Sequence, residues 1–146
     1  LYHSYTAAAQ AGLDQYGEKV LAKTPLTTII RAMEYYGTEH YHVFFGTDDQ
    51  ERSYYVLINQ DEHYVIPAGA GIAPEELRQK VEERFASMPV EIRHLVPGRE
   101  DGQLLYEALV VDEKGRYYYL YYDYYTGEGL KEIRLSHPWF LDQKSS

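Results

Sequence analysis

Cysteine is absent from the 146 residues of this chain. Its absence excludes disulfide bridges, thiolate catalysis and zinc held by cysteine. Long apolar runs are absent too. Because a membrane-spanning helix needs about 18 or more such residues, we expect no segment of this chain to cross a bilayer. The chain starts at Leu1 without a methionine, so we expect that a signal or anchor segment was removed ahead of it.

Positive charge is scarce, with 14 Lys and Arg residues against 23 Asp and Glu residues and a formal net charge of −9. An acidic surface repels phosphate backbones, so nucleic acid is not an expected partner. Hydrophobic residues make up 45% of the chain and charged residues 25%, which is typical of a globular protein. The length suits one medium domain or two very small ones.

Recognisable catalytic motifs are missing as well. Ser4, Ser53 and Ser87 lack the glycine context of a nucleophile elbow. Glu107 lies within an apolar run, where it is expected to be a buried carboxylate if its face points inward. No partner base or second carboxylate accompanies it. We therefore assign no catalytic and no cofactor-binding residue, name no cofactor, and expect that the protein is not an enzyme.

The first half of the chain predicts a helix followed by strands. Apolar side chains recur every three or four positions over residues 2–23, which predicts one helical face, and Pro25 ends the helix. The members of that face are Tyr5, Ala9, Leu13, Tyr16 and Val20. Runs rich in β-branched and aromatic residues then predict strands at 26–37, 40–46, 52–59 and 64–67.

The second half predicts the same order of elements. Pro74 suits the first position of a helix, and Pro89 is expected to end that helix. Its apolar stripe consists of Leu77, Val81, Phe85 and Met88. Strands are predicted at 90–96, 104–112, 117–125 and 130–135, with a turn over 97–102 between the first two.

The two halves therefore predict an α+β protein of two tandem units, each one helix packed on a sheet of three or four antiparallel strands. The expected units are residues 1–68 and 69–136, and residues 137–146 form a tail. The halves resemble each other in pattern rather than in identity. A lone unit of about 65 residues is near the lower size limit for an independent core, so we expect the units not to survive separation.

Tyrosine is abundant, and seven of the nine residues from 117 to 125 are tyrosine. On a strand, alternate side chains share a face, so Leu120 indicates that Tyr118, Tyr122 and Tyr124 point inward. Such a run is explained in part by the preference of tyrosine for strands. The opposite face is the candidate partner-binding surface, because exposed tyrosines offer rigid contact area with a polar tip. Its members are Tyr117, Tyr119, Tyr121 and Tyr125.

Histidines and turn acids are weaker candidates. His40 and His42 share a strand face and, with His63, would make a three-histidine set for zinc or copper. No acidic residue stands at a recognised ligand spacing, so half-exposed strand histidines are the favoured interpretation and no metal ligand is assigned. Asp48 lies in a turn, 47–52, that lacks the glycine of a calcium loop, so its acids are expected to be solvated.

A family resemblance covers nearly the whole chain. The order of PEELRQKVEERF and the strands up to LKEI, with Asp123, Thr126 and Gly127 in the last hairpin, resembles a PepSY unit. The stretch YHVFFGTDDQERSYYVLINQDEHYVIP is similar to the partner unit of the TseB-like (YpmB-like) cell-wall elongation regulators of Gram-positive bacteria. The resemblance implies two cystatin-like units held outside the cell by one N-terminal membrane anchor, which these residues do not include.

The resemblance also implies a function. The family's members are non-enzymatic modulators of a penicillin-binding protein in lateral wall synthesis, so the expected partner is a protein of that class. Two alternatives stay open. One is a PepSY-like peptidase inhibitor or regulator that docks a strand or loop into a protease cleft. The other is direct binding of wall glycan or peptide, although an acidic protein should bind anionic wall polymers poorly.

Overall fold

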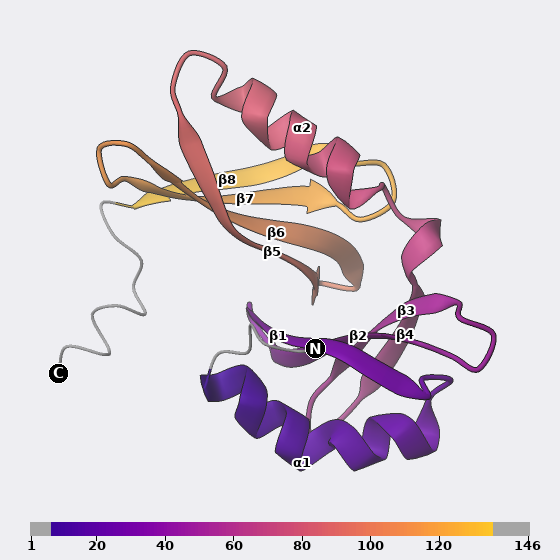
Figure 1. The fold of residues 1–146 in the computed structure, drawn as a ribbon. Helices are drawn as coiled ribbons and strands as arrows, with labels where there is room; N and C mark the ends of the chain where they lie inside the picture. Colours follow the sequence, from indigo (N-terminus) through magenta and orange to yellow (C-terminus); the bar gives the residue numbers. More distant parts are fainter. Residues whose placement is uncertain (1–6, 136–146) are drawn as a thin grey trace, which may run out of the picture. The chain divides into compact units, whose positions relative to one another are not determined.

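The computed structural model describes residues 7–135, and residues 7–14 as backbone only. Two helices are each followed by a four-stranded antiparallel sheet, so the α+β fold of two tandem units is confirmed (Figure 1). The first set of elements is α1 (Ala7–Lys23), β1 (Thr28–Tyr36), β2 (His40–Thr47), β3 (Ser53–Ile58), β4 (His63–Pro67) and the 3₁₀ turn η1 (Ala68–Ala70). The second set is α2 (Pro74–Arg84), β5 (Val90–Glu100), β6 (Gln103–Asp112), β7 (Tyr117–Asp123) and β8 (Gly129–Leu135).

The first sheet is a meander in the order β1-β2-β3-β4, and α1 lies across one of its faces (Figure 1). Val20 of α1 packs with Ala32, Phe44 and Val56 from three neighbouring strands in a buried apolar cluster. These strand residues share a face because Ala32 pairs with Phe44, and Phe44 pairs with Val56. The predicted inward position of Val20 is thus confirmed, whereas Tyr5 lies outside the described residues.

The second sheet repeats the order as β5-β6-β7-β8, with α2 along one face (Figure 1). Leu77 and Val81 of α2 are completely buried, and the Phe85 ring meets the Tyr118 ring edge-on with centroids 4.8 Å apart. The helix ends at Arg84, before the expected stop at Pro89, because Phe85 leaves helical geometry with φ −115°. The apolar stripe continues past the helix, in the turn that leads to β5.

The chain divides into two compact units that are not simple halves. Unit 1 contains residues 1–71 together with 96–104, and unit 2 contains 72–95 together with 105–146. The segment 96–104 is the end of β5, its tight turn and the start of β6. The division at residues 68 and 69 stays a prediction.

Segment 96–104 packs closely within unit 1. The Tyr35 hydroxyl donates to Glu100 at 2.9 Å, and the Arg99 guanidinium lies 4.2 Å from the centre of the Tyr64 ring. A Cβ on Gly98 would lie 2.4 Å from the Tyr35 ring, so only glycine fits there. The prediction of a turn over 97–102 is wrong at its start, because β5 runs to Glu100 and only Asp101 and Gly102 form the turn. Pro97 is compatible with this assignment, because β5 lies at the edge of its sheet, where proline is tolerated.

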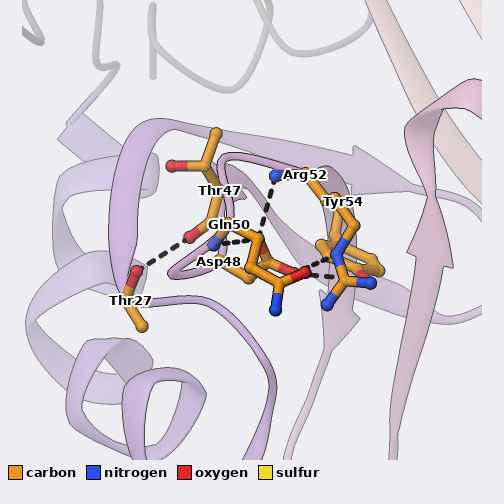
Figure 2. A network of polar contacts seen from close by, with 6 residues as sticks. All are labelled: Thr27, Thr47, Asp48, Gln50, Arg52 and Tyr54. Atoms are coloured by element: carbon orange, nitrogen blue, oxygen red, sulfur yellow. Dashed lines mark hydrogen bonds and ion pairs between the residues drawn. The ribbon is translucent and has the colours of Figure 1, made fainter.

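The turn between β2 and β3 is built around Asp48 (Figure 2). One carboxylate oxygen accepts the backbone N–H groups of Gln50 and Arg52 at 2.9 and 2.8 Å. The other accepts the Arg52 guanidinium at 2.7 Å and lies 3.5 Å from the Tyr54 hydroxyl. Asp48 is only 5% exposed, so the expectation of a solvated turn acid is wrong for this residue. Its carboxylate fills the inside of the turn.

The turn between β6 and β7 repeats this arrangement. Asp112 accepts the backbone N–H groups of Lys114 and Arg116, each at 2.9 Å. Its second oxygen accepts the Arg116 guanidinium at 2.7 Å and the Tyr118 hydroxyl at 3.0 Å. The order Asp, Arg, Tyr is the same as in residues 48–54, at the same spacing. The two halves were expected to resemble each other in pattern rather than in identity, and at these turns they also share three residues at equal spacing.

The repeated contacts lower the pKa of both aspartates. Burial alone would raise the pKa of Asp112, but hydrogen bonds from the Arg116 backbone, its guanidinium and the Tyr118 hydroxyl outweigh burial and lower that pKa to about 2. The pKa of Asp48 is lowered against burial in the same way, by the Arg52 backbone and guanidinium. Both carboxylates are therefore ionised in the folded protein at moderate pH.

Candidate functional site

The tyrosine run forms β7, which lies between β6 and β8 in the second sheet. Its inward face is as predicted: Tyr118, Leu120 and Tyr122 are 4%, 3% and 8% exposed. Tyr124 follows the strand, is completely buried, and stacks on the Tyr106 ring with centroids 4.9 Å apart. These side chains lie on the α2 side of the sheet, where the Tyr118 ring meets the helix end. Their role is to build the core.

The other side of the strand carries the predicted partner-binding residues. We call Tyr117, Tyr119, Tyr121, Lys131 and Ile133 the outer face of unit 2. Tyr119 pairs with Ile133, and Tyr121 pairs with Lys131, so strands β7 and β8 both contribute to this face. The Lys131 ammonium lies 5.1 Å from the centre of the Tyr121 ring, a distance at which a cation is attracted to an aromatic face.

Exposure differs sharply among the four predicted tyrosines. Tyr119 is only 7% exposed, so the expectation that its side chain lies open is wrong. It stands on a central strand between Leu109 and Ile133, and neighbours on both sides cover it. Burial, and then the charge of Glu107, raise the pKa of Tyr119 to about 12. The partner-binding role stays a prediction for the other three, of which two are half-buried and Tyr125 is 53% exposed.

A buried carboxylate, Glu107, connects the outer face to β5. It is only 4% exposed, although it pairs with Tyr121 on the face opposite α2 and not on the inward face that the expectation of burial assumed. Its oxygens contact the His94 ring nitrogen at 2.9 Å and accept the Tyr121 hydroxyl at 2.8 Å. The expectation that Glu107 has no partner base is therefore wrong. His94 comes from a neighbouring strand and stands 13 positions away in the chain, so no local spacing could indicate it.

The chemistry available to this group is limited. A histidine on a carboxylate can hold or pass a proton, and the His94 side chain is 38% exposed to solvent. Among the residues whose side chains the structure describes, the hydrogen bonds of Glu107 join it to His94 and Tyr121, and none brings a serine or threonine hydroxyl to this pair for activation. The group orients the Tyr121 ring and thereby shapes the outer face.

The residues that carried the PepSY resemblance have a structural role. The Asp123 carboxylate accepts the backbone N–H of Thr126 at 3.0 Å and its hydroxyl at 3.2 Å. The N–H of Gly127 donates to the Asp123 carbonyl at 2.9 Å. The Tyr124 carbonyl also accepts the Ile72 N–H at 2.9 Å, which ties the β7–β8 turn to the chain ahead of α2. This motif therefore fixes a turn rather than a reactive site.

The histidines of the first sheet have an acidic neighbour that chain spacing does not reveal. Glu34 pairs with His42 across β1 and β2, and its carboxylate lies 2.7 Å from the His40 Nε2 atom. His63 is not part of this group, because Ile58 on β3 stands between it and His42 in the sheet. The strand register, not the spacing along one strand, brings Glu34 to the two histidines.

No helix in the described part of the chain is long and apolar enough to cross a membrane.

Two family descriptions match different parts of the chain. Residues 11–59 match the "Cell wall elongation regulator TseB-like domain", and residues 71–132 match the "Peptidase propeptide and YPEB domain". The first match begins within α1 and ends just after β3, and the second begins just before α2 and ends within β8. The two matches thus correspond to the two helix-plus-sheet repeats.

Individual proteins from Bacillus subtilis are also similar. The chain is 29% identical over 137 residues to the "Probable cell wall elongation regulator TseB" of strain 168, covering 91% of this chain and 83% of that protein. The solved structure of the "YpmB protein from Bacillus subtilis" superposes with a TM-score of 0.71 and covers 85% of this chain and 98% of that chain. Its identity is 24%, so this likeness concerns the fold alone.

Proposed function

We propose that this chain, which carries a TseB-like domain followed by a PepSY domain and is a distant homologue of the Bacillus subtilis regulator, is a non-catalytic interaction module that acts outside the cytoplasm on cell-wall elongation. The homology over 91% of the chain carries the proposal. A membrane anchor ahead of these residues and a penicillin-binding protein as partner complete it. Charge supports a protein partner, because a net charge of −9 disfavours anionic wall polymers.

The surface that we propose for this partner is the outer face of unit 2 without the buried Tyr119, together with its adjoining edge. Ile133 and Tyr125 are 37% and 53% exposed, and Leu130 is 39% exposed. Tyr121 is held in place by Glu107, and a ring whose orientation is fixed in advance loses little entropy on binding. Strand β8 ends the sheet, so its outer backbone groups are available to a partner strand.

Two other functions compete with this one. A peptidase inhibitor or regulator would use the same edge to enter a protease cleft, as the name of the second matching family suggests. A direct binder of wall glycan or peptide would use the aromatic rings as a stacking surface. Each of the three functions predicts a different captured partner, so one capture experiment distinguishes them.

The capture experiment places a photo-crosslinking phenylalanine derivative at Ile133 in the protein displayed on bacterial cells through an N-terminal anchor. The control variant carries the same group at Glu82, an exposed residue of α2. We expect a penicillin-binding protein to be crosslinked at Ile133 and not at Glu82. A protease or bare peptidoglycan captured at Ile133 would instead support one of the two alternatives, and equal capture at both positions would contradict the proposed surface.

The non-catalytic part of the proposal has its own test. Purified protein is incubated with wall fragments and peptides, and products are followed by mass spectrometry. We expect no turnover, because His94 and Glu107 lack an activated nucleophile among the described residues. Turnover that disappears in Glu107→Gln or His94→Ala would show that the pair is a catalytic acid and base.

A further inference from the structure

Three potential metal ligands converge on the α1 side of the first sheet. The Glu34 carboxylate, the His40 Nε2 atom and the His42 Nδ1 atom all lie within 4.8 Å of one another. The Oε1 atom of Glu34 is 2.7 Å from His40 Nε2 and 3.5 Å from His42 Nδ1. Tetrahedral zinc with bonds of about 2.0–2.1 Å separates its ligands by about 3.3 Å, so the three atoms need only small side-chain adjustments.

The surroundings hold these side chains in place. The Tyr36 ring stacks on the His40 ring, with centroids 4.5 Å apart and planes 4° from parallel. The Tyr16 ring of α1 lies 4.9 Å from the His42 ring. The side chains of Glu34 and His42 are only 6% and 13% exposed, while that of His40 is 42% exposed. Glu34 and His42 therefore form the buried part of the site, and His40 forms its solvent-exposed side.

One atom of the group lacks a partner within the described residues. The Nδ1 atom of His42 is buried and makes no hydrogen bond, although a buried ring nitrogen without one is costly. Burial, and then the neighbouring His40, lower the pKa of His42, while Glu34 acts in the opposite direction. A metal ion at this point would satisfy the unpartnered nitrogen.

We propose that Glu34, His40 and His42 form a binding site for a divalent transition-metal ion, with Zn²⁺ as its natural probe. Two imidazoles and one carboxylate are ligands that suit zinc, copper and nickel rather than calcium or magnesium, which prefer oxygen ligands only. Three protein ligands leave the fourth tetrahedral position for water or for a donor atom from a partner, on the exposed side of His40. The proposal is independent of the function proposed above and replaces the expectation that no residue here binds metal.

An ion pair without metal is the competing explanation for the same contacts. It accounts for the short distance between His40 and Glu34, since an imidazole N–H can donate a hydrogen bond to a carboxylate. It does not account for His42, whose Nδ1 atom points to the same oxygen without bonding to it. His94 and Glu107 in unit 2 provide a natural comparison, because that pair consists of one histidine and one carboxylate and should bind no ion tightly.

The test is calorimetric titration of the full chain with zinc chloride after removal of metals by a chelator. We expect one equivalent to bind with low-micromolar affinity or better, and cobalt to give the visible absorption of a tetrahedral complex. His40→Ala, His42→Ala and Glu34→Gln should each weaken zinc binding by about 10-fold or more, because each removes one of three ligands. His63→Ala and His94→Ala are the matched controls and should bind zinc like the natural sequence.

Thermal unfolding separates a lost ligand from a lost fold. Zinc should raise the melting temperature of the natural sequence and of the two controls, but not that of the three ligand variants. Circular dichroism in chelator checks that the ligand variants are folded before zinc is added, and Glu34→Gln keeps the size of the side chain. Absence of saturable binding, or binding of unchanged affinity in all three ligand variants, would overturn the proposal.

Discussion

The β2–β3 and β6–β7 turns of this protein make the same contacts with different residues around them. Asp48 and Asp112 each sit inside their turn and accept two backbone N–H groups and an arginine. Glu51 has a φ of 62° in the first turn, where the second has Gly115 with a φ of 80°. The contacts of the aspartate fix the shape of the turn. The identity of the residue with positive φ can therefore differ between the two turns.

The polar clusters of the two units differ far more than the turns do. In unit 1 the cluster of Glu34, His40 and His42 lies on the face covered by α1, beside Tyr16. In unit 2 the pair of His94 and Glu107 lies on the face opposite α2. The same scaffold therefore carries these clusters on different faces of its two sheets.

Truncating one core aromatic ring in each unit gives the largest expected effect. Phe44→Ala in unit 1 and Phe85→Ala in unit 2 should each lower the free energy of unfolding by about 3–5 kcal/mol, because both rings are at most 4% exposed. Denaturant unfolding also tests whether the units depend on each other. If they do, each variant should shift one common transition. Two transitions, each shifted by only one variant, would mean that the units unfold independently.

Gly98→Ala should lower the stability of unit 1 by about 1–3 kcal/mol through overpacking. The added Cβ would meet the buried Tyr35 ring at 2.4 Å. Gly69→Ala is the control, because nothing lies within 4 Å of the Cβ it would carry. The midpoints of urea unfolding measure both, and equal midpoints would mean that segment 96–104 does not pack on Tyr35 as described.

Removing the tyrosine hydroxyls sharpens the comparison of the turns. Tyr118→Phe should lower the free energy of unfolding by about 1–2 kcal/mol, since its hydroxyl is buried and bonds to an ionised carboxylate at 3.0 Å. Tyr54→Phe should lower the free energy of unfolding by only a few tenths of the Tyr118→Phe effect, because the Tyr54 hydroxyl lies 3.5 Å from the Asp48 carboxylate. Chemical denaturation of both variants measures the difference, and the reverse ranking would contradict it.

Exchanging the positive-φ residues tests whether the turns are equivalent. Gly115→Glu should cost about 1 kcal/mol, because a residue with a Cβ is strained at a φ of 80°. Glu51→Gly should be neutral or slightly stabilising, since relief of that strain is offset by a more flexible unfolded chain. Thermal unfolding of the two single variants gives both values. A stabilising Gly115→Glu would mean that the turns differ in more than this position.

Acid should weaken the turns in a defined interval of pH. The pKa of Asp112 is lowered from 3.8 to about 2, so its carboxylate contributes stability that is present above the higher value and is lost as pH falls towards the lower one. Asp112→Asn removes this contribution. We expect its free energy of unfolding to vary less over this interval than that of the natural sequence, and parallel curves would contradict the lowered pKa.

Periodicity was sufficient to predict the order of elements, because Leu77, Val81 and the alternating strand residues each obey one local rule. The β5 strand was missed at Pro97 and Gly98, since these residues indicate a turn unless the strand is known to be an edge. Asp48 and Asp112 could have been found by aligning the halves, where Asp, Arg and Tyr recur at equal spacing.

The contacts between histidines and glutamates could not be predicted from the sequence, for a different reason. Glu34 meets His40, and Glu107 meets His94, across strands whose register is set by the whole sheet. Burial of Tyr119 likewise depends on its place on a central strand. A sequence gives the face on which a strand residue stands, but the partner opposite it follows only from the register.

The discontinuity of unit 1 has a consequence for how this protein is made. A ribosome releases residues 1–71 well before it releases 96–104, although both belong to one compact unit. Until then the Tyr35 hydroxyl has no Glu100 to bond to, and its ring has no Gly98 to cover it. Domains usually fold during synthesis in the order in which they emerge. In this protein, unit 1 cannot complete its fold until residues 72–95 of unit 2 and then its own segment 96–104 have been synthesised.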